Sequence, residues 1–244
     1  VPFLTEKSGP FHKYNIAATV RQMREKKLSI PCFDTSCDLS VEGNDAVAVT
    51  LQLIQVAKQA EVPYVSVVAL QDKEDLVRAR LAEILPVAEA AEVTILVKTS
   101  GIFSDTARLR AMMDDFACDG LAALWDVQHP FRDSEESADT TIKNLGAYVK
   151  HVHLRDSDDT SRYQLIGEGT MPIAQVMRAL SSVNYDGFIS LEWKPEWMEE
   201  LQERDTAIRQ RGNIKVVQYT WLWSASKTSK IYAKHPDWFI SHDQ

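Results

Sequence analysis

Cysteine, long apolar runs and excess positive charge are all scarce in this chain, and each scarcity excludes a class of protein. There are three cysteines in 244 residues, and the spacing of Cys32 and Cys37 is too long for a CxxC metal or redox motif. No apolar run approaches the roughly 20 residues that cross a membrane, and the opening VPFLTEKSGP does not form a signal peptide. We therefore expect a cytoplasmic protein without a disulfide framework or a membrane partner.

The charge balance excludes a further class of partner. The formal net charge is −8, from 27 Lys and Arg against 35 Asp and Glu. This charge opposes binding to a phosphate backbone, and no basic stripe interleaved with aromatic residues is present. We therefore expect no nucleic-acid partner. Hydrophobic residues make up 45% of the chain, which is enough for a globular protein with a sizeable core.

Short apolar segments alternate with helical patterns along most of the chain. Amphipathic spacing predicts helices over 16–27, 48–57, 76–91, 106–116 and 173–180. Six β-rich segments are candidate strands: 28–33, 63–69, 93–98, 121–126, 150–155 and 187–192. This alternation predicts βαβ units with a parallel sheet, and the length suits one α/β barrel of the TIM type.

The barrel predicted in this way is incomplete. Only six strands can be counted, whereas a closed barrel has eight. A loop and a helix stand where one or two opening strands would be expected. We predict a barrel domain over 1–211, truncated at its N-terminus, and a tail over 212–244. The tail begins with an apolar, strand-like run, and the sequence leaves open whether it adds a strand or starts another module. Sheet edges left exposed by missing strands would favour a homo-oligomer.

Residues that ligate metal ions follow three of the predicted strands. Asp126 and His129 follow one, His153 lies in the next with His151, and Glu192 ends the last. Carboxylates and an imidazole at the carboxyl ends of neighbouring strands suit Mn²⁺, Co²⁺, Mg²⁺ or Zn²⁺. Alternation along their strands places His151 and His153 opposite Val152 and Leu154, and Glu192 opposite Leu191 and Trp193, as expected for the polar mouth of a barrel.

Lys98 ends a fourth strand, where a cationic side chain would lie near the expected metal. Its ammonium would be strongly repelled by a divalent ion about 4 Å away. Three outcomes are physically open. The side chain swings out of the site, it loses its proton because of burial near a cation, or its ammonium replaces the metal and pairs with Asp126 and Glu192.

Several other side chains have both a functional and an ordinary structural interpretation. Arg155 and Lys194 share the inward parity and are candidates for substrate binding, but either could simply form a salt bridge with Glu192. His151 is best interpreted as a buried core histidine. Asp34, between two cysteines at another strand end, is a further candidate for substrate contact, and the amides of the loop over 167–169 could hold a sugar or phosphate oxygen, although a plain turn is at least as good an interpretation.

Four segments in order resemble the sugar phosphate isomerase/epimerase family, the xylose isomerase-like TIM barrels. They are WDVQHPFRDSEES at 125–137, GAYVKHVHLRDS at 146–157, YQLIGEGTMPI at 163–173 and NYDGFISLEW at 184–193. Such proteins hold a divalent metal with two glutamates, an aspartate and a histidine, and the two glutamates move a proton at a sugar carbon.

The resemblance implies a role for each matching residue. Asp126, His153 and Glu192 would ligate the metal, Glu192 would also act as the base, and His129 would contact the substrate or the outer shell of the metal. Lys98 stands where the remaining family glutamate falls, and it would act as the complementary acid or as an electrostatic stabiliser.

We therefore hypothesise a metal-dependent isomerase or epimerase of a small sugar or sugar phosphate, working through an enediolate. The alternative is a catalytically impaired barrel that binds a sugar or a partner protein and has no metal because of Lys98. A third hypothesis, metal-dependent hydrolysis of DNA at abasic sites, is disfavoured by the net charge of −8 and by too few ligands for a multi-metal site.

Overall fold

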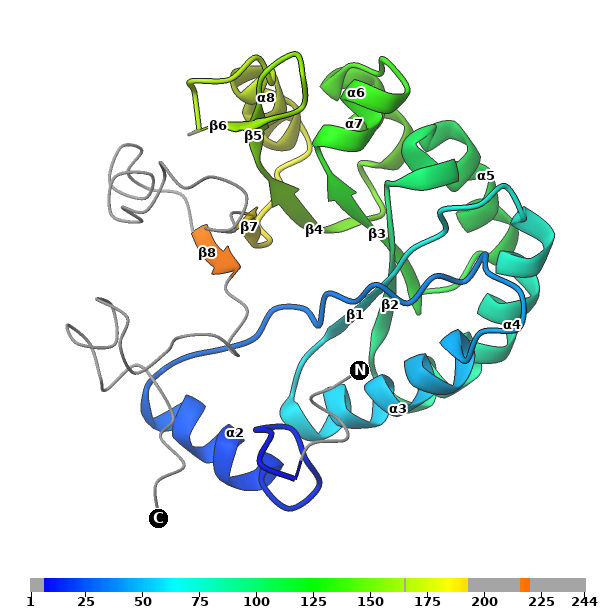
Figure 1. Cartoon of the computed structure of the whole chain (residues 1–244), viewed down its shortest axis with the longest axis vertical. Helices are drawn as coiled ribbons and strands as arrows, with labels where there is room; N and C mark the ends of the chain where they lie inside the picture. The colour runs from blue at the N-terminus through cyan, green and yellow to red at the C-terminus, as the bar shows by residue number, and fades with distance from the viewer. Residues whose placement is uncertain (1–6, 165, 193–215, 220–244) are drawn as a thin grey trace.

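In the described part of this protein the sheet has six parallel strands, which lie side by side in the order in which they occur in the chain. The computed structural model describes residues 7–164, 166–192 and 216–219 (Figure 1). The sheet order is β1-β2-β3-β4-β7-β8, and every neighbouring pair is parallel. The strands are β1 (Tyr64–Val67), β2 (Thr94–Lys98), β3 (Leu121–Asp126), β4 (Val149–Leu154), β7 (Ile189–Glu192) and β8 (Val216–Tyr219). This arrangement is an incomplete barrel, as the sequence predicted.

The helices lie on the outer side of the molecule, and the strands lie inside them (Figure 1). They are α2 (Ile16–Glu25), α3 (Ala46–Ala60), α4 (Glu74–Ala91), α5 (Thr106–Phe116), α6 (Gln128–Asp133), α7 (Ala138–Leu145) and α8 (Ile173–Ser182). A short 3₁₀ helix, η1 (Gly101–Ser104), follows β2, and a small antiparallel pair, β5 (Asp156–Ser157) with β6 (Tyr163–Gln164), follows β4. The five predicted helices are confirmed with shifts of a few residues at most, and α5 has the bounds that the sequence predicted.

Alternation along each strand divides the buried side chains between the two faces of the sheet. Residues of one parity, such as Val97 and Trp125, belong to the large core between sheet and helices. Residues of the other parity, Leu96, Ala122 and Leu124, form a separate small cluster inside the barrel. Because Lys98 and Asp126 continue this second parity at the strand ends, the inner face is apolar at its base and charged at its mouth.

The predicted strand over 28–33 is wrong in its extent. The chain meets β1 only at two isolated parallel bridges, Phe33 with Val65 and Asp38 with Val68. Between them the N–H of Thr35 donates to Ser66 Oγ at 2.8 Å, and Thr35 Oγ1 donates to the Ser66 carbonyl at 2.6 Å. These side-chain bonds replace the backbone ladder, so the segment runs beside β1 without forming a strand.

β8 lies within the predicted tail and pairs with β7 in parallel, and the choice between an added strand and the start of another module stays open. The division of the chain at 211 and the homo-oligomer stay predictions. None of the described helices is long and apolar enough to cross a membrane.

Candidate active site

The Lys98 ammonium lies among three carboxylates at the mouth of the barrel. Its Nζ atom is 3.5 Å from Glu192 Oε1, 3.6 Å from Asp126 Oδ2 and 3.7 Å from Asp34 Oδ2. Lys98, Asp126 and Glu192 are the last residues of β2, β3 and β7, and Asp34 comes from the segment beside β1. The side chains are between 0% and 13% exposed, so these charges interact with little screening by solvent.

Arg155 is a second cation that joins two of the same carboxylates. Its Nη1 donates to Glu192 Oε2 at 2.8 Å, and its Nη2 lies 3.2 Å from both carboxylate oxygens of Asp126. Nη2 also donates to His129 Nε2 at 2.9 Å, while His129 Nδ1 lies 2.7 Å from Asp133 Oδ2. Because a guanidinium only donates, His129 Nε2 must accept, and the imidazole carries its proton on Nδ1.

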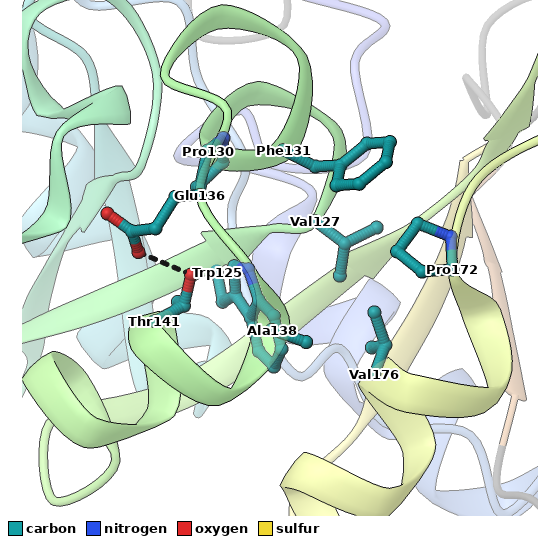
Figure 2. A pocket seen from close by; sticks show the side chains of 9 residues that line it. All are labelled: Trp125, Val127, Pro130, Phe131, Glu136, Ala138, Thr141, Pro172 and Val176. Carbon is teal, nitrogen blue, oxygen red and sulfur yellow. Dashed lines mark hydrogen bonds between the residues drawn. The ribbon is translucent and has the colours of Figure 1, made fainter.

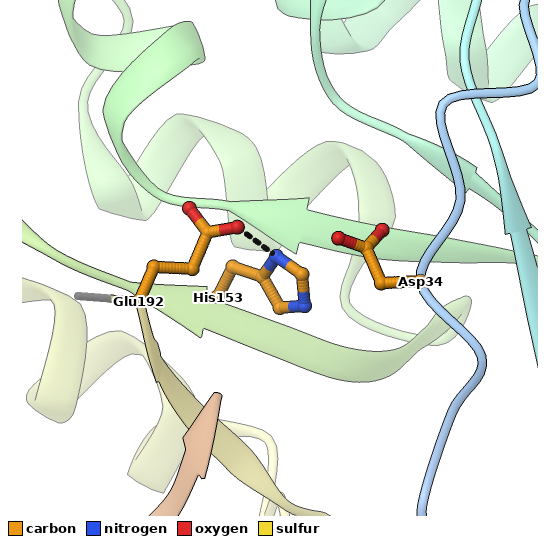
Figure 3. Close-up of side chains that lie close together, drawn as sticks. All are labelled: Asp34, His153 and Glu192. Atoms are coloured by element: carbon orange, nitrogen blue, oxygen red, sulfur yellow. Dashed lines mark ion pairs between the residues drawn. The ribbon is translucent and has the colours of Figure 1, made fainter. Parts of the chain in front are cut away.

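His153 stands between Glu192 and Asp34, as Figure 3 shows. Its Nδ1 is 2.9 Å from Glu192 Oε1. Ligand atoms of Asp34, His153 and Glu192 all lie within 4.8 Å of one another, which makes these three side chains a candidate metal-ligand cluster. The sequence predicted Asp126, His153 and Glu192 as the ligand set. In the structure Asp34, rather than Asp126, completes the cluster with His153 and Glu192.

Asp34 was not assigned as a ligand from the sequence, and its position depends on a long-range contact. Ser66 Oγ, on β1, donates to Asp34 Oδ1 at 2.7 Å and accepts the N–H of Thr35. The available signal was that Asp34 directly follows an apolar segment, as Asp126 and Glu192 also do. That signal indicated a substrate contact at most.

The charges of the site fix its protonation states. Burial alone would lower the pKa of Lys98, but the carboxylates of Asp34, Glu192 and Asp126 outweigh it and raise the pKa above its ordinary value. Burial would raise the pKa of Glu192, but the hydrogen bond from His153 and the charges of Lys98 and Arg155 hold it well below its usual range. The site therefore contains a protonated lysine and an ionised glutamate at neutral pH.

Of the three outcomes open for Lys98, the geometry corresponds to the third. The side chain does not swing out, because it is only 13% exposed and points at the carboxylates. Among these carboxylates it keeps its proton, because they raise its pKa. The ammonium pairs with Asp126 and Glu192, and with Asp34 as well.

A divalent metal does not fit the side chains as they are arranged. The family resemblance implies a metal held by carboxylate and imidazole donors, and metal–oxygen bonds are about 2.0–2.6 Å long. Here the carboxylates surround an ammonium at 3.5–3.7 Å, and the Nδ1 atom of His153 faces Glu192. A metal among Asp34, His153 and Glu192 would have to share this space with Lys98.

The structure thus brings together six of the seven residues singled out by the sequence: Lys98, Asp126, His129, His153, Arg155 and Glu192. Their individual roles as ligand, base or substrate contact stay predictions. Lys194, the seventh, lies outside the described residues, as do Trp193 and Trp197.

The loop over 167–169 does not present its amides to a ligand. The N–H groups of Gly167 and Gly169 both donate to Asp156 Oδ2, at 2.7 and 3.2 Å. The other carboxylate oxygen, Asp156 Oδ1, accepts the N–H groups of Ser157 and Met171. The plain turn is therefore the correct interpretation, and Asp156 is the residue that holds it.

His151 is a buried core histidine, as expected. Its Nε2 lies 2.8 Å from Ser190 Oγ on β7, and its ring contacts that of His153 edge-on at 5.3 Å between centroids. Burial, with a smaller contribution from His153, lowers the pKa of His151 to about 3. The imidazole is neutral at physiological pH and supplies no charge to the site.

A separate small cavity lies on the outer side of β3, next to α6, α7 and α8 (Figure 2). Its lining is mostly apolar and includes Trp125, Phe131 and Pro172. Its one carboxylate, Glu136, already accepts the hydroxyls of Thr106 and Thr141, each at 2.6 Å. This cavity offers little polar recognition and contains none of the residues singled out by the sequence.

Comparison with known proteins supports the barrel fold. A sequence model described as xylose isomerase-like TIM barrel matches residues 2–211. Fructoselysine 3-epimerase from Escherichia coli O157:H7 is 31% identical over 81 residues, which is 33% of this chain and 29% of that protein. The chain therefore matches less than one third of the length of this relative.

Two solved structures share the fold. A D-tagatose 3-epimerase-like protein is 20% identical with a TM-score of 0.63, and the match covers 81% of this chain and 85% of the other. A xylose isomerase-like TIM barrel protein from Mycobacterium smegmatis, in complex with magnesium, is 16% identical with a TM-score of 0.58, covering 79% and 74% of the two chains. At these identities the likeness establishes the fold alone.

Proposed function

Because this chain belongs to the xylose isomerase-like TIM barrel family, we propose that it binds a small keto sugar, or the corresponding sugar phosphate, and transfers a proton at the carbon next to the carbonyl. Sugar 3-epimerases among the similar proteins support this substrate class. The observation that carries the proposal is the buried carboxylate of Glu192 beside two fixed cations, Lys98 and Arg155, at the barrel mouth.

The proposed step uses three side chains. The Glu192 carboxylate removes the proton from the carbon next to the carbonyl, and the electron pair of that C–H bond moves to form an enediolate with negative charge on the carbonyl oxygen. Lys98 and Arg155 stabilise this charge, because both cations are already in place before it develops. Return of the proton from Glu192 to the former carbonyl carbon, with a proton moving from the hydroxyl to the enediolate oxygen, gives an isomer. Inversion to an epimer needs a donor on the other face, and Lys98 is the candidate acid for that step, regaining its proton when solvent takes the one held by Glu192.

The same contacts limit the rate. Glu192 accepts from His153 and Arg155 and faces Lys98, so its pKa is held well below the usual range. A carboxylate with a low pKa is a weak base, and proton abstraction is fastest when the pKa of the base lies near the working pH. We therefore expect slow turnover. This contact set also favours the second candidate function, a barrel that binds a sugar without turning it over.

Hydrogen exchange distinguishes the two functions. The protein is incubated in D₂O with D-fructose, D-tagatose or fructoselysine, and loss of the proton next to the carbonyl is followed by NMR. Wild-type protein should exchange that proton in at least one sugar, and Glu192→Gln should slow the exchange by about 10²-fold or more. Glu83→Gln, on the exposed face of α4, is the matched control and should leave the rate unchanged.

Calorimetry with the same sugars completes the test. Saturable binding without exchange would favour the binding barrel over the enzyme. Absence of both exchange and binding for every sugar would overturn the proposed function.

A further inference from the structure

We infer that the Lys98 ammonium is the permanent cation of this site, and that it excludes a divalent metal from the cluster formed by Asp34, His153 and Glu192. The exclusion of metal follows from the charges and distances alone. Its consequence, that sugar chemistry here needs no metal, rests on the function proposed above.

The first argument is the position of the ammonium. Three carboxylates from three separate elements surround Nζ at nearly equal distances of 3.5, 3.6 and 3.7 Å. A lysine that merely formed a salt bridge would approach one carboxylate closely, at about 2.8 Å. Lys98 instead occupies the shared centre of the three acids, which is where a cation common to all of them would lie.

The second argument is that the carboxylates are already engaged. Asp34 accepts from Ser66, Asp126 accepts from Arg155, and Glu192 accepts from Arg155 and lies 2.9 Å from His153 Nδ1. A metal that bound the same oxygens of Asp126 and Glu192 would compete with the Arg155 guanidinium as well as with the ammonium. Loss of either cation would leave a buried polar group without its partner, which is unfavourable.

The third argument is charge. Two cations, Lys98 and Arg155, already face the carboxylates of the site. A divalent ion about 4 Å from the ammonium would be repelled enough to weaken its binding on the order of 10⁶-fold at an effective dielectric of about 20. A site that would otherwise bind metal at micromolar concentration would then bind none at cellular concentrations.

The fourth argument is that Lys98 cannot easily leave. It is the last residue of β2, paired in register with Leu124 of β3, and its alternation places it on the inner face. Its side chain lies in the buried mouth, and moving it outward would leave three acids opposite a single arginine. The cation is therefore a fixed part of the fold, unlike a metal that exchanges with solution.

Direct metal titration tests the inference without using activity. Co²⁺ is added to the full chain after dialysis against a chelator, and binding is read from visible d–d absorption and from the shift in melting temperature. Wild-type protein should show neither signal at micromolar Co²⁺. Lys98→Glu, which replaces the cation by a fourth carboxylate, should bind Co²⁺ at least 10³-fold more tightly.

Two further variants make the test decisive. Lys150→Glu introduces the same charge change at an exposed position of β4 and should bind Co²⁺ no better than wild-type protein. Lys98→Met removes the charge without adding a ligand and should gain weaker Co²⁺ binding than Lys98→Glu. It also replaces Lys98→Glu as the test if circular dichroism shows that the latter does not fold with or without metal.

The outcomes separate this inference from the proposed function. Micromolar Co²⁺ binding by wild-type protein would overturn the inference, and so would failure of every folded Lys98 variant to gain metal affinity. Absence of sugar exchange and sugar binding would overturn the proposed function and leave the inference standing. Metal-free wild-type protein that still exchanges the sugar proton would support both.

Discussion

Replacing Lys98 by methionine should destabilise the protein strongly, and more so at neutral than at acidic pH. Methionine is similar in length and unbranched, so the change removes the charge and largely keeps the packing. It leaves the buried Asp126 and Glu192 and the partly buried Asp34 at the barrel mouth, and among the described contacts Arg155 is the remaining permanent cation, paired with Asp126 and Glu192.

The magnitude follows from the burial of the three acids, whose side chains are 12%, 0% and 8% exposed. Removal of one partner from a buried ion pair costs about 3–5 kcal/mol, because an uncompensated charge remains. For a domain of this size each kcal/mol lowers the melting temperature by about 2–4 °C, so the expected loss is about 6–20 °C.

The pH dependence has a definite sign. In the wild-type protein the pKa of Glu192 is lowered, so this residue adds stability above its ordinary value of 4.5, and that stability is lost as the pH falls through the lower folded value. Without Lys98 that pKa rises, so the variant has less of this stability to lose. The difference in unfolding free energy between wild type and Lys98→Met should therefore be smaller at about pH 3 than at about pH 8, and the change should occur below about pH 4.5.

Urea and thermal unfolding, followed by circular dichroism at both pH values, measure this difference. Lys150→Met, at an exposed position of β4, is the control and should melt within about 2 °C of wild type. A Lys98→Met protein that melts as wild type at pH 8 would refute the assignment of Lys98 as the counter-charge. A loss of equal size at both pH values would mean that packing, not charge, is responsible.

Two further perturbations test other parts of the site region. A Cβ on Gly169 would clash with Asp156 Oδ1 and the Ser157 carbonyl, so Gly169→Ala should cost about 1–3 kcal/mol or more. Gly120→Ala, where the nearest atoms belong to the flexible side chain of Glu89, is the comparison and should cost less. Equal losses in urea unfolding would contradict the tight fit of the loop. Burial lowers the pKa of His151 to about 3, so the unfolded chain binds a proton between about pH 6.5 and 3 that the folded chain does not. Stability should fall with decreasing pH in this range, by at most about 1.4 kcal/mol per unit, and His151→Gln should remove that part of the slope.

The convergence of charges at the barrel mouth could be predicted because it depends on local periodicity. In parallel strands with a side-chain period of two, residues of one parity at the carboxyl ends must meet on one face. Lys98, Asp126 and Glu192 satisfy that condition in the sequence itself. In the structure the Lys98 ammonium lies 3.6 Å from Asp126 and 3.5 Å from Glu192. No knowledge of packing was needed for this step.

Asp34 could not be assigned in the same way, because its position depends on contacts with residues about 30 positions away. The segment over 28–33 has strand character, yet it meets β1 only at Phe33, and beyond that bridge Ser66 bonds to Asp34 and Thr35. Side-chain hydrogen bonds of this kind carry no periodic signal. The sequence left the loop over 167–169 open between a turn and a ligand site for a related reason, since only the fold brings the amides of Gly167 and Gly169 to Asp156.

A lysine in place of a bound ion, as inferred above, would link the stability of this protein to its proposed chemistry. A metal stabilises a fold by an amount that depends on its free concentration, and it can be withdrawn by a chelator. An ammonium attached to β2 is present whenever the strand is formed, so the acids at the mouth stay neutralised under all conditions that keep the sheet intact. The same permanence keeps Glu192 paired with a cation at all times, which lowers its basicity. Stability that is independent of metal and slow proton transfer are therefore two consequences of one side chain, and a substitution at Lys98 should change both together.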